Sequence, residues 1–289
     1  MILVTGSTGH FGKATIDFLV KKGYPVSQLN ALVRDEAKAE DLKSQGVQIR
    51  VGDYSNPALL NTAFTGVDKL LLVSSSDLNN RTQHHINAIK AAKQAGVKHI
   101  VYTSFQRKNE VNSPIQMIAQ AHLDAEKEIL ASGMTYTILQ NGLYADGLPM
   151  FMGENVLETG IFLPAGTTKA ALTVRADMAE AAANVLLEDG HENAIYLTAT
   201  TEKNSYADVA NILSEITGKS VTYTDAPLEA YKEVLKNAGV PEFFAGFLAS
   251  FSEAIKQGEF DFSNGDLEKL LHHKPTTLKD FLKTVYKPS

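Results

Sequence analysis

The sequence contains no cysteine and no tryptophan among its 289 residues. Without cysteine the chain can form neither a disulfide nor a thiolate zinc or iron–sulfur site, and it has no cysteine nucleophile. A cysteine-free chain is typical of a reducing compartment, and we therefore expect a cytoplasmic protein.

The sequence also lacks an excess of basic residues and any long apolar run. Its net charge is −6 at neutral pH, which argues against a nucleic-acid-binding surface, because such a surface needs a basic face. Apolar runs such as Leu70–Val73 are far too short to span a membrane. No charged and then apolar leader precedes the first glycine loop, so we expect no signal peptide. These absences predict a soluble protein with neither nucleic-acid nor membrane partners.

In the first half of the chain, short apolar runs alternate with longer amphipathic stretches. Strands are expected at 2–4, 29–33, 47–51, 69–73, 97–102 and 136–139. Helices are expected at 10–22, 36–45, 57–64, 81–95 and 115–131. The strands are apolar throughout, as in a parallel sheet that helices cover on both faces. The pattern predicts an α/β protein with a doubly wound Rossmann sheet.

After about residue 140 the pattern becomes mostly helical. Helices are expected at 177–187, 206–216, 228–237, 242–256 and 278–285, with short strands near 194–197 and 221–224. We therefore expect a cofactor-binding Rossmann domain over residues 1–142 and a smaller, mostly helical substrate-binding lobe over residues 143–289. Residues from about 165 to 200 are expected to pack back onto the Rossmann domain.

A glycine motif, G-x-x-G-x-x-G, follows the first expected strand directly and consists of Gly6, Gly9 and Gly12. Gly6 allows the sharp turn, Gly9 lets backbone amides approach a pyrophosphate, and Gly12 lets the next helix pack closely on the sheet. The other loop residues expected at the cofactor are Thr8, His10 and Phe11. A glycine turn without a ligand is the alternative, but the position inside a βαβ unit favours dinucleotide binding.

The end of the second expected strand indicates which dinucleotide binds. An acidic residue there would accept a hydrogen bond from the ribose of NAD, whereas arginine would bind the 2′-phosphate of NADP. Arg34 lies at this position, with Lys38 one turn further on, and a guanidinium can bind a phosphate through two hydrogen bonds. Asp35 has two interpretations, an N-cap of the next helix or an NAD-specifying acid. We expect NADP(H), with NAD(H) left open, and no metal.

Polar residues at the ends of later strands are further candidates for cofactor binding. Asp53 could accept from the adenine amino group or cap the following helix. The serines could let the dinucleotide pass and donate hydrogen bonds, or could be ordinary turn residues. The candidates after the fourth, fifth and sixth strands are Ser74, Ser75, Ser76, Thr103, Asn141 and Gly142.

Several segments of the chain together follow one family pattern. They are ILVTGSTGHFG at 2–12, ALVR at 31–34, VGDY at 51–54, KLLLVSSS at 69–76, AGVKHIVYTS at 95–104, LQNGLY at 139–144 and GHEN at 190–193. With them the chain resembles the atypical NmrA-like branch of the short-chain dehydrogenase/reductase superfamily. Within that branch it looks most like bacterial NAD(P)H:quinone oxidoreductases and triphenylmethane reductases. The resemblance implies direct hydride transfer without flavin.

Most enzymes of that superfamily use Tyr-x-x-x-Lys, in which the lysine lowers the tyrosine pKa so that the phenol can donate a proton. None of the ten tyrosines in this chain is followed by lysine four positions later. Ordinary carbonyl reduction and epimerase or dehydratase chemistry therefore lose most of their support. A quinone or a cationic dye is already a strong hydride acceptor, so proximity and orientation can supply much of the catalysis.

The candidate catalytic residues are His122, Asn141 and Tyr144. His122 and Glu126 share a helix face, which suggests either a histidine near the substrate oriented by Glu126 or a solvated pair. Asn141 and Tyr144 follow the sixth strand, where Tyr144 could stack on a flat ring or simply pack between the lobes. Phe105 is a weaker candidate for the same wall.

Two functions fit these residues. The first is an NADPH-dependent reductase that transfers a hydride directly to a quinone or similar planar acceptor, without the tyrosine–lysine dyad. The alternative is an NADP(H)-binding redox-sensing regulator of the NmrA type, which would bind the cofactor without turnover and contact a partner through an apolar patch. The oligomeric state stays open, a homodimer included.

Overall fold

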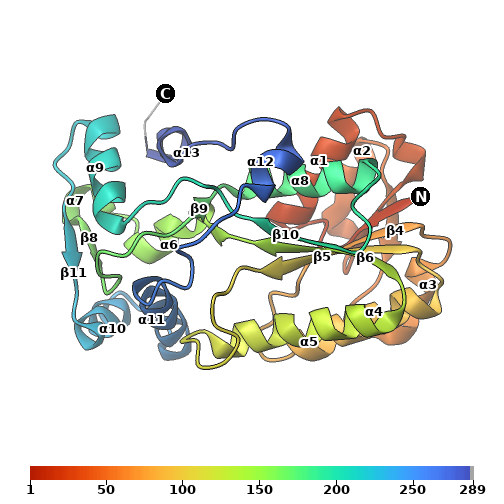
Figure 1. The fold of residues 1–289 in the computed structure, drawn as a ribbon, viewed down its shortest axis with the longest axis horizontal. Helices are drawn as coiled ribbons and strands as arrows, with labels where there is room; N and C mark the ends of the chain where they lie inside the picture. The colour runs from red at the N-terminus through yellow and green to blue at the C-terminus, as the bar shows by residue number, and fades with distance from the viewer. Residues whose placement is uncertain (287–289) are drawn as a thin grey trace.

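A seven-stranded parallel sheet forms the centre of the larger part of the molecule (Figure 1). The computed structural model describes residues 1–286. The strand order is β10-β6-β5-β4-β1-β2-β3. The strands are β1 (Ile2–Val4), β2 (Leu29–Val33), β3 (Gln48–Val51), β4 (Lys69–Leu72), β5 (His99–Phe105), β6 (Thr135–Asn141) and β10 (Ala194–Thr198). The first six have the 3-2-1-4-5-6 order of a doubly wound Rossmann sheet, which confirms the predicted fold class.

Helices cover both faces of this sheet (Figure 1). One face carries α1 (His10–Lys21), α8 (Arg175–Leu187) and α12 (Asp266–Leu271). The other carries α3 (Pro57–Phe64), α4 (Arg81–Gln94) and α5 (Gln116–Ser132). Apolar side chains alternate between the two layers: Val4 and Leu71 belong to the core under α1 and α8, whereas Leu3 and Leu70 belong to the core under α3 and α4. The continuously apolar strands therefore fill two cores at once.

The predicted helix over 36–45 is divided in the structure. A short 3₁₀ helix, η2 (Glu36–Ala39), leads into α2 (Glu40–Ser44), and another 3₁₀ turn, η1 (Val26–Gln28), precedes β2.

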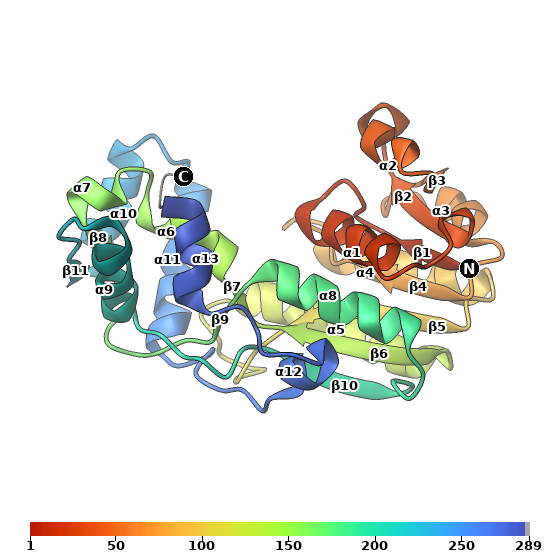
Figure 2. The same ribbon diagram turned by 90° about the horizontal axis from the view of Figure 1, so that it is seen from above.

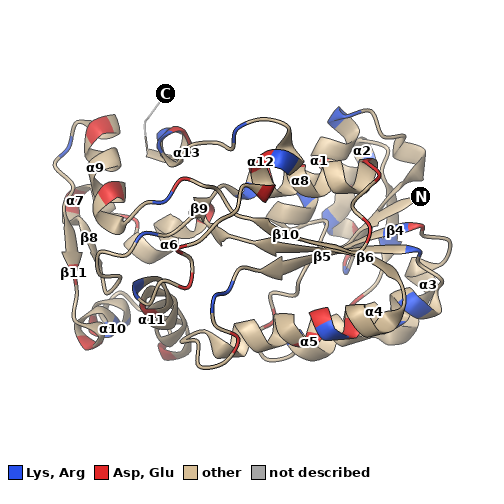
Figure 3. Ribbon diagram, viewed as in Figure 1, with Lys and Arg blue, Asp and Glu red and all other residues tan. Residues whose placement is uncertain are grey.

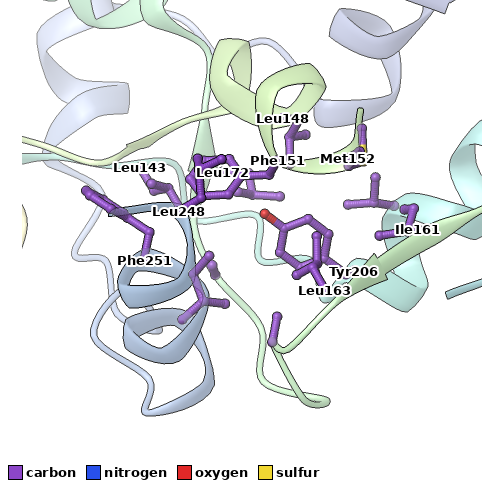
Figure 4. Close-up of a cluster of buried hydrophobic side chains, with 14 of the residues drawn as sticks. Leu143, Leu148, Phe151, Met152, Ile161, Leu163, Leu172, Tyr206, Leu248 and Phe251 are labelled. Carbon is purple, nitrogen blue, oxygen red and sulfur yellow. The ribbon is translucent and has the colours of Figure 1, made fainter. Parts of the chain in front are cut away.

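The remaining elements form a smaller lobe at the carboxyl ends of the strands (Figure 2). Its strands form two parallel pairs, β7 (Leu143–Tyr144) with β9 (Leu172–Thr173) and β8 (Ile161–Leu163) with β11 (Tyr223–Asp225). Its helices are η3 (Ala145–Gly147), α6 (Leu148–Met152), α7 (Val156–Thr159), α9 (Tyr206–Thr217), α10 (Leu228–Asn237), α11 (Glu242–Lys256) and α13 (Leu278–Tyr286). Figure 4 shows its apolar core, in which Phe151, Tyr206 and Phe251 lie among leucines and Ile161.

Three elements from the second half of the chain, α8, β10 and α12, belong to the layers of the Rossmann sheet. Strand β10 pairs in parallel with β6, so that Thr198 lies beside Asn141, and α8 packs along α1. The chain thus enters the smaller lobe, returns to the sheet with α8 and β10, enters the lobe again, and returns to the sheet with α12 before it reaches α13 in the lobe. A single boundary at residue 142 remains a prediction.

Charged residues of both signs are distributed over the outer helices (Figure 3). Several form ion pairs between elements, such as Lys279 of α13 with Glu215 of α9 and Lys22 with Glu180 of α8. Within residues 1–286, no helix combines the length and the apolar character needed to cross a membrane.

Candidate functional site

A cavity of about 630 Å³ opens where the strand order reverses between β1 and β4. Loops after β1, β2, β3 and β4 line it, and Tyr144 and Arg175 close it from the side of the smaller lobe. Doubly wound sheets bind ligands in the crevice at this reversal point, outside the carboxyl ends of the strands. The volume is in the range of small-molecule and cofactor pockets, about 300–1,000 Å³.

The glycine loop forms one end of the cavity. Gly6 has a φ of +59°, which a residue with a side chain rarely adopts, and its carbonyl accepts a hydrogen bond of 2.9 Å from Gly9 N–H. A Cβ atom on Gly12 would lie only 2.5 Å from the Gly6 carbonyl oxygen. Helix α1 begins at His10 with Gly9 as N-cap and no capping side chain, so the free N–H groups of its first turn can bind an anion. The loop therefore fits a pyrophosphate.

Buried hydrogen bonds hold this loop against the sheet. The Ser7 hydroxyl lies 2.7 Å from the Val4 carbonyl oxygen and 3.0 Å from that of Leu32, and it can donate to either. Tyr54 donates a bond of 2.7 Å to the Val73 carbonyl, which ties the loop after β3 to the end of β4. The walls of the cavity are thus fixed by the protein itself before any ligand binds.

Arg34 lies in the cavity wall at the end of β2, and its side chain is exposed. Among residues 1–286 it has no carboxylate within ion-pair distance, so its guanidinium is free to bind a phosphate. Asp35 instead caps η2, because its carboxylate accepts a hydrogen bond of 3.0 Å from Ala37 N–H. Lys38 is exposed but does not line the cavity.

Asp53 also lines the cavity, beyond the end of β3. Its Oδ1 atom accepts hydrogen bonds from the hydroxyl and the backbone N–H of Ser55, both at 2.7 Å. These two bonds lower the pKa of the Asp53 carboxyl, so it is ionised at neutral pH and can accept a hydrogen bond from a ligand.

All three serines after β4 line the cavity. Hydrogen bonds to neighbouring elements fix the backbone of two of them. Ser74 N–H donates to Thr103 Oγ1 at 2.8 Å, and Ser75 N–H donates to His85 Nε2 at 2.9 Å. Thr103 itself is buried and does not reach the cavity. It supports the serine loop and does not face a ligand directly.

Beyond β6 the structure brings Tyr144, but not its neighbours, to the cavity wall. Asn141 is buried and donates through Nδ2 to Tyr144 Oη at 3.2 Å. A Cβ atom on Gly142 would lie 2.7 Å from Thr173 Oγ1, so the glycine allows β9 to pack closely. Asn141 and Gly142 therefore support the cavity wall without lining the cavity themselves.

Two arginines that line the cavity together with Tyr144 were not predicted from the sequence as site residues. Arg81 is the first residue of α4, and its buried Nε has no hydrogen-bond partner within residues 1–286. Burial lowers the pKa of Arg81. Arg175 lies over the Tyr144 ring, with its guanidinium carbon 4.8 Å from the ring centroid. Neither has a carboxylate partner among the described residues, so both can bind an electron-rich ligand group.

The predicted pairing of His122 with Glu126 is wrong. Glu126 accepts hydrogen bonds from Arg107, at 3.0 Å to Nη1, and from the Ser104 hydroxyl. His122 is only 3% exposed, does not line the cavity, and stacks against Phe105. This arrangement gives no support to a direct contact between His122 and a substrate.

His122 instead completes a buried chain of hydrogen bonds. The Ser75 backbone N–H can only donate, so His85 Nε2 accepts, and the proton of the neutral His85 ring is on Nδ1. Tyr102 Oη lies 3.2 Å from this Nδ1 and 2.8 Å from His122 Nδ1, so it can accept from His85 and donate to His122; the Ala121 carbonyl oxygen, at 3.4 Å, is a second acceptor for His85 Nδ1. The chain ties α4 and α5 to the serine loop.

Acidification is expected to destabilise the protein through this histidine pair. Burial lowers the pKa of His85 to about 4 and holds that of His122 well below its usual range. Both rings stay neutral in the folded protein while they protonate in the unfolded chain below a pH of about 6.5, so stability is lost as the pH falls. Between about pH 7.5 and 5 the free energy of unfolding should fall by roughly 2 kcal/mol per histidine. Urea denaturation at the two pH values measures this.

The control is His122→Asn, whose amide oxygen can accept the Tyr102 hydrogen bond without a titrating ring. This variant should lose the share of one histidine, roughly 2 kcal/mol, from the pH-dependent change. An unchanged pH dependence would mean that His122 does not contribute to it.

The chain matches the model of the NmrA-like family over residues 1–282. It is 41% identical to quinone oxidoreductase 2 of Escherichia coli over 97% of this chain and 96% of that protein. It is 35% identical to the NAD(P)H azoreductase of Xenophilus azovorans, over 85% and 84% of the two chains. The crystal structure of a Citrobacter sp. triphenylmethane reductase complexed with NADP(H) superimposes with a TM-score of 0.91 at 40% identity, covering 98% of this chain and 99% of that one. The predicted resemblance is confirmed, and the chain belongs to the NmrA-like family.

Proposed function

We propose that this protein is an NADPH-dependent reductase that transfers a hydride directly to a quinone or similar planar acceptor. One observation carries the proposal: a single cavity has a glycine loop and Arg34 at one end and Tyr144, Arg81 and Arg175 at the other. The names of the relatives support it, since one is a quinone oxidoreductase, another an NAD(P)H azoreductase, and the triphenylmethane reductase was crystallised with NADP(H).

The residues present fit NADPH at the end of the cavity near β1, β2 and β3. The N–H groups at the start of α1 and the glycine loop suit a pyrophosphate, and Arg34 suits a 2′-phosphate. Asp53 suits the adenine amino group. Bound NADPH would supply the hydride.

The opposite end of the cavity suits the acceptor. The serines after β4 give a narrow polar floor, and the Tyr144 ring gives a flat wall that can stack on a planar molecule. No tyrosine–lysine dyad is needed to hold such a molecule in place, because orientation alone brings its reacting carbon to the hydride donor.

A cofactor-binding sensor without turnover is the second candidate, and an exposed apolar groove favours it. The groove lies between the start of α5 and α11, where Met117 is 54% and Phe243 59% exposed. Exposed apolar patches of this kind mark contact sites for other proteins.

Steady-state assays separate the two candidates. We expect the purified protein to oxidise NADPH, followed by its loss of absorbance, in the presence of menadione as a quinone and of malachite green as a cationic triphenylmethane dye. NADH in place of NADPH is the matched cofactor control. Tight NADPH binding with no turnover on either acceptor would contradict the reductase and favour the sensor.

A further inference from the structure

Tyr144 lines the cavity, and its hydroxyl has the hydrogen-bond pattern of a proton donor. We propose that Tyr144 is a catalytic residue that protonates acceptors whose reduction places negative charge on an oxygen atom, such as quinones. The inference rests on the proposed function and deepens it, because it names the residue that completes the reaction and the class of acceptor that needs it.

The hydrogen bonds behind Tyr144 leave its own hydrogen available. The hydroxyl of Thr198 on β10 donates to Asn141 Oδ1 at 2.7 Å, and this orients the amide so that Asn141 Nδ2 donates to Tyr144 Oη. Thr198 and Asn141 are both buried, so the orientation is fixed by the protein. Tyr144 Oη therefore accepts one bond from the protein, and its O–H has no acceptor within residues 1–286.

Two positive charges line the cavity together with Tyr144. The Arg175 guanidinium is 4.8 Å from the centroid of the Tyr144 ring, and Arg81 lines the same end of the cavity. Burial raises the pKa of Tyr144, so the phenol holds its proton at neutral pH. Asn141 and both arginines favour the phenolate, and the Asp146 carboxylate opposes it. Asn141 and the two arginines take the electrostatic role that the lysine has in the Tyr-x-x-x-Lys dyad.

The proposed step balances for a quinone. The incoming hydride brings two electrons and forms a C–H bond at an unsubstituted carbon of the quinone double bond, and the negative charge goes to the oxygen of the conjugated carbonyl. The Tyr144 O–H bond breaks, and its proton forms an O–H bond on that oxygen. Loss of one proton from the same carbon to water and uptake of one proton by the second oxygen then give the hydroquinone. The Tyr144 phenolate then regains a proton from water.

A cationic triphenylmethane dye provides a contrasting acceptor. Its central carbon carries a positive charge, so addition of a hydride gives a neutral product and no proton is taken up. A proton donor is required for the quinone and is irrelevant to the dye. A residue that only shapes the cavity would instead affect both acceptors.

The test is Tyr144→Phe, assayed with NADPH against menadione and against malachite green. We expect kcat for menadione to fall by about 10- to 100-fold, within the usual range for loss of a general acid. We expect kcat for malachite green and the Kd for NADPH, measured by fluorescence titration, to change by less than about twofold, because neither depends on the phenolic proton. The binding of 2-naphthol, a redox-inert mimic of the product, should weaken several-fold in calorimetry because one hydrogen bond is lost.

The matched control is Tyr206→Phe, which removes a buried hydroxyl without a hydrogen-bond partner in the core of the smaller lobe. It should leave both activities unchanged. Equal losses with menadione and malachite green in Tyr144→Phe, or no loss with either, would overturn the proton-donor role while the reductase stands. Absence of turnover in the unmodified protein would overturn both proposals.

Discussion

Replacing Gly12 by valine is expected to abolish detectable NADPH binding. The new Cβ would lie 2.5 Å from the Gly6 carbonyl oxygen and 2.8 Å from that of Thr5, and both are backbone atoms that cannot rotate away. The start of α1 would have to move off the glycine loop, which separates the helix N–H groups from the phosphate position. We expect the Kd for NADPH, followed by fluorescence titration, to rise by at least about 100-fold, since a charge-assisted phosphate cradle is lost.

Gly246→Ala is the matched glycine control. Gly246 lies inside α11, and a Cβ there would meet nothing within 4 Å. NADPH binding should be unchanged, and the free energy of unfolding should rise by up to about 1 kcal/mol, because alanine is the better helix former. Circular dichroism verifies that both variants fold. Normal NADPH binding by a folded Gly12→Val protein would show that the cofactor does not use this loop.

Replacing Arg34 by alanine is expected to remove most of the preference for NADPH over NADH. Hydrogen bonds to a charged group contribute about 1.5–3 kcal/mol, which corresponds to a rise in the Kd for NADPH of roughly 10- to 150-fold. NADH has no 2′-phosphate, so its Kd should change by less than about threefold. The measurement is a pair of binding titrations at one fixed salt concentration, because screening weakens a contact of an exposed arginine.

Lys38→Ala serves as the charge-matched control. The substitution removes one positive charge near Arg34, but Lys38 does not line the cavity. Its effect on either cofactor should stay below about twofold, as for other exposed charges. If the affinities for NADPH and NADH fell equally in Arg34→Ala, the 2′-phosphate assignment would be wrong.

Most of the Rossmann sheet could be predicted from the sequence, because its signals are local. Strands β1 and β2 begin and end as expected, since each is a short apolar run bounded by turn residues. Strand β5 continues to Phe105, three residues beyond the prediction, because pairing with β6 extends through Thr103, Ser104 and Phe105. The two-residue strands β7 and β9 exist only through their pairing with each other, and no local pattern predicts them.

The residues of the candidate site likewise fall into those that local sequence signals predict and those that they do not. The glycine loop and Arg34 are recognisable because their roles follow from position after a strand. Arg81 and Arg175 were missed because one begins a helix beyond the serine loop and the other comes from the second half of the chain. His122 was misjudged because helical spacing gives its neighbours on the helix but not the tertiary contacts with Tyr102 and Phe105 that bury it.

The return of the chain to the sheet after β9 limits how this protein can be recombined with its relatives. A fragment ending at residue 142 would lose β10, which leaves the outer edge of β6 unpaired, and would lose α8, which covers α1. A chimaera joined at that point would receive Tyr144 and Thr198 from one parent and Asn141 from the other, although Asn141 is hydrogen-bonded to both. Exchange of the smaller lobe between relatives therefore calls for at least three joins, after Tyr144, before residue 173 and after residue 200, which keep residues 1–144 and 173–200 together.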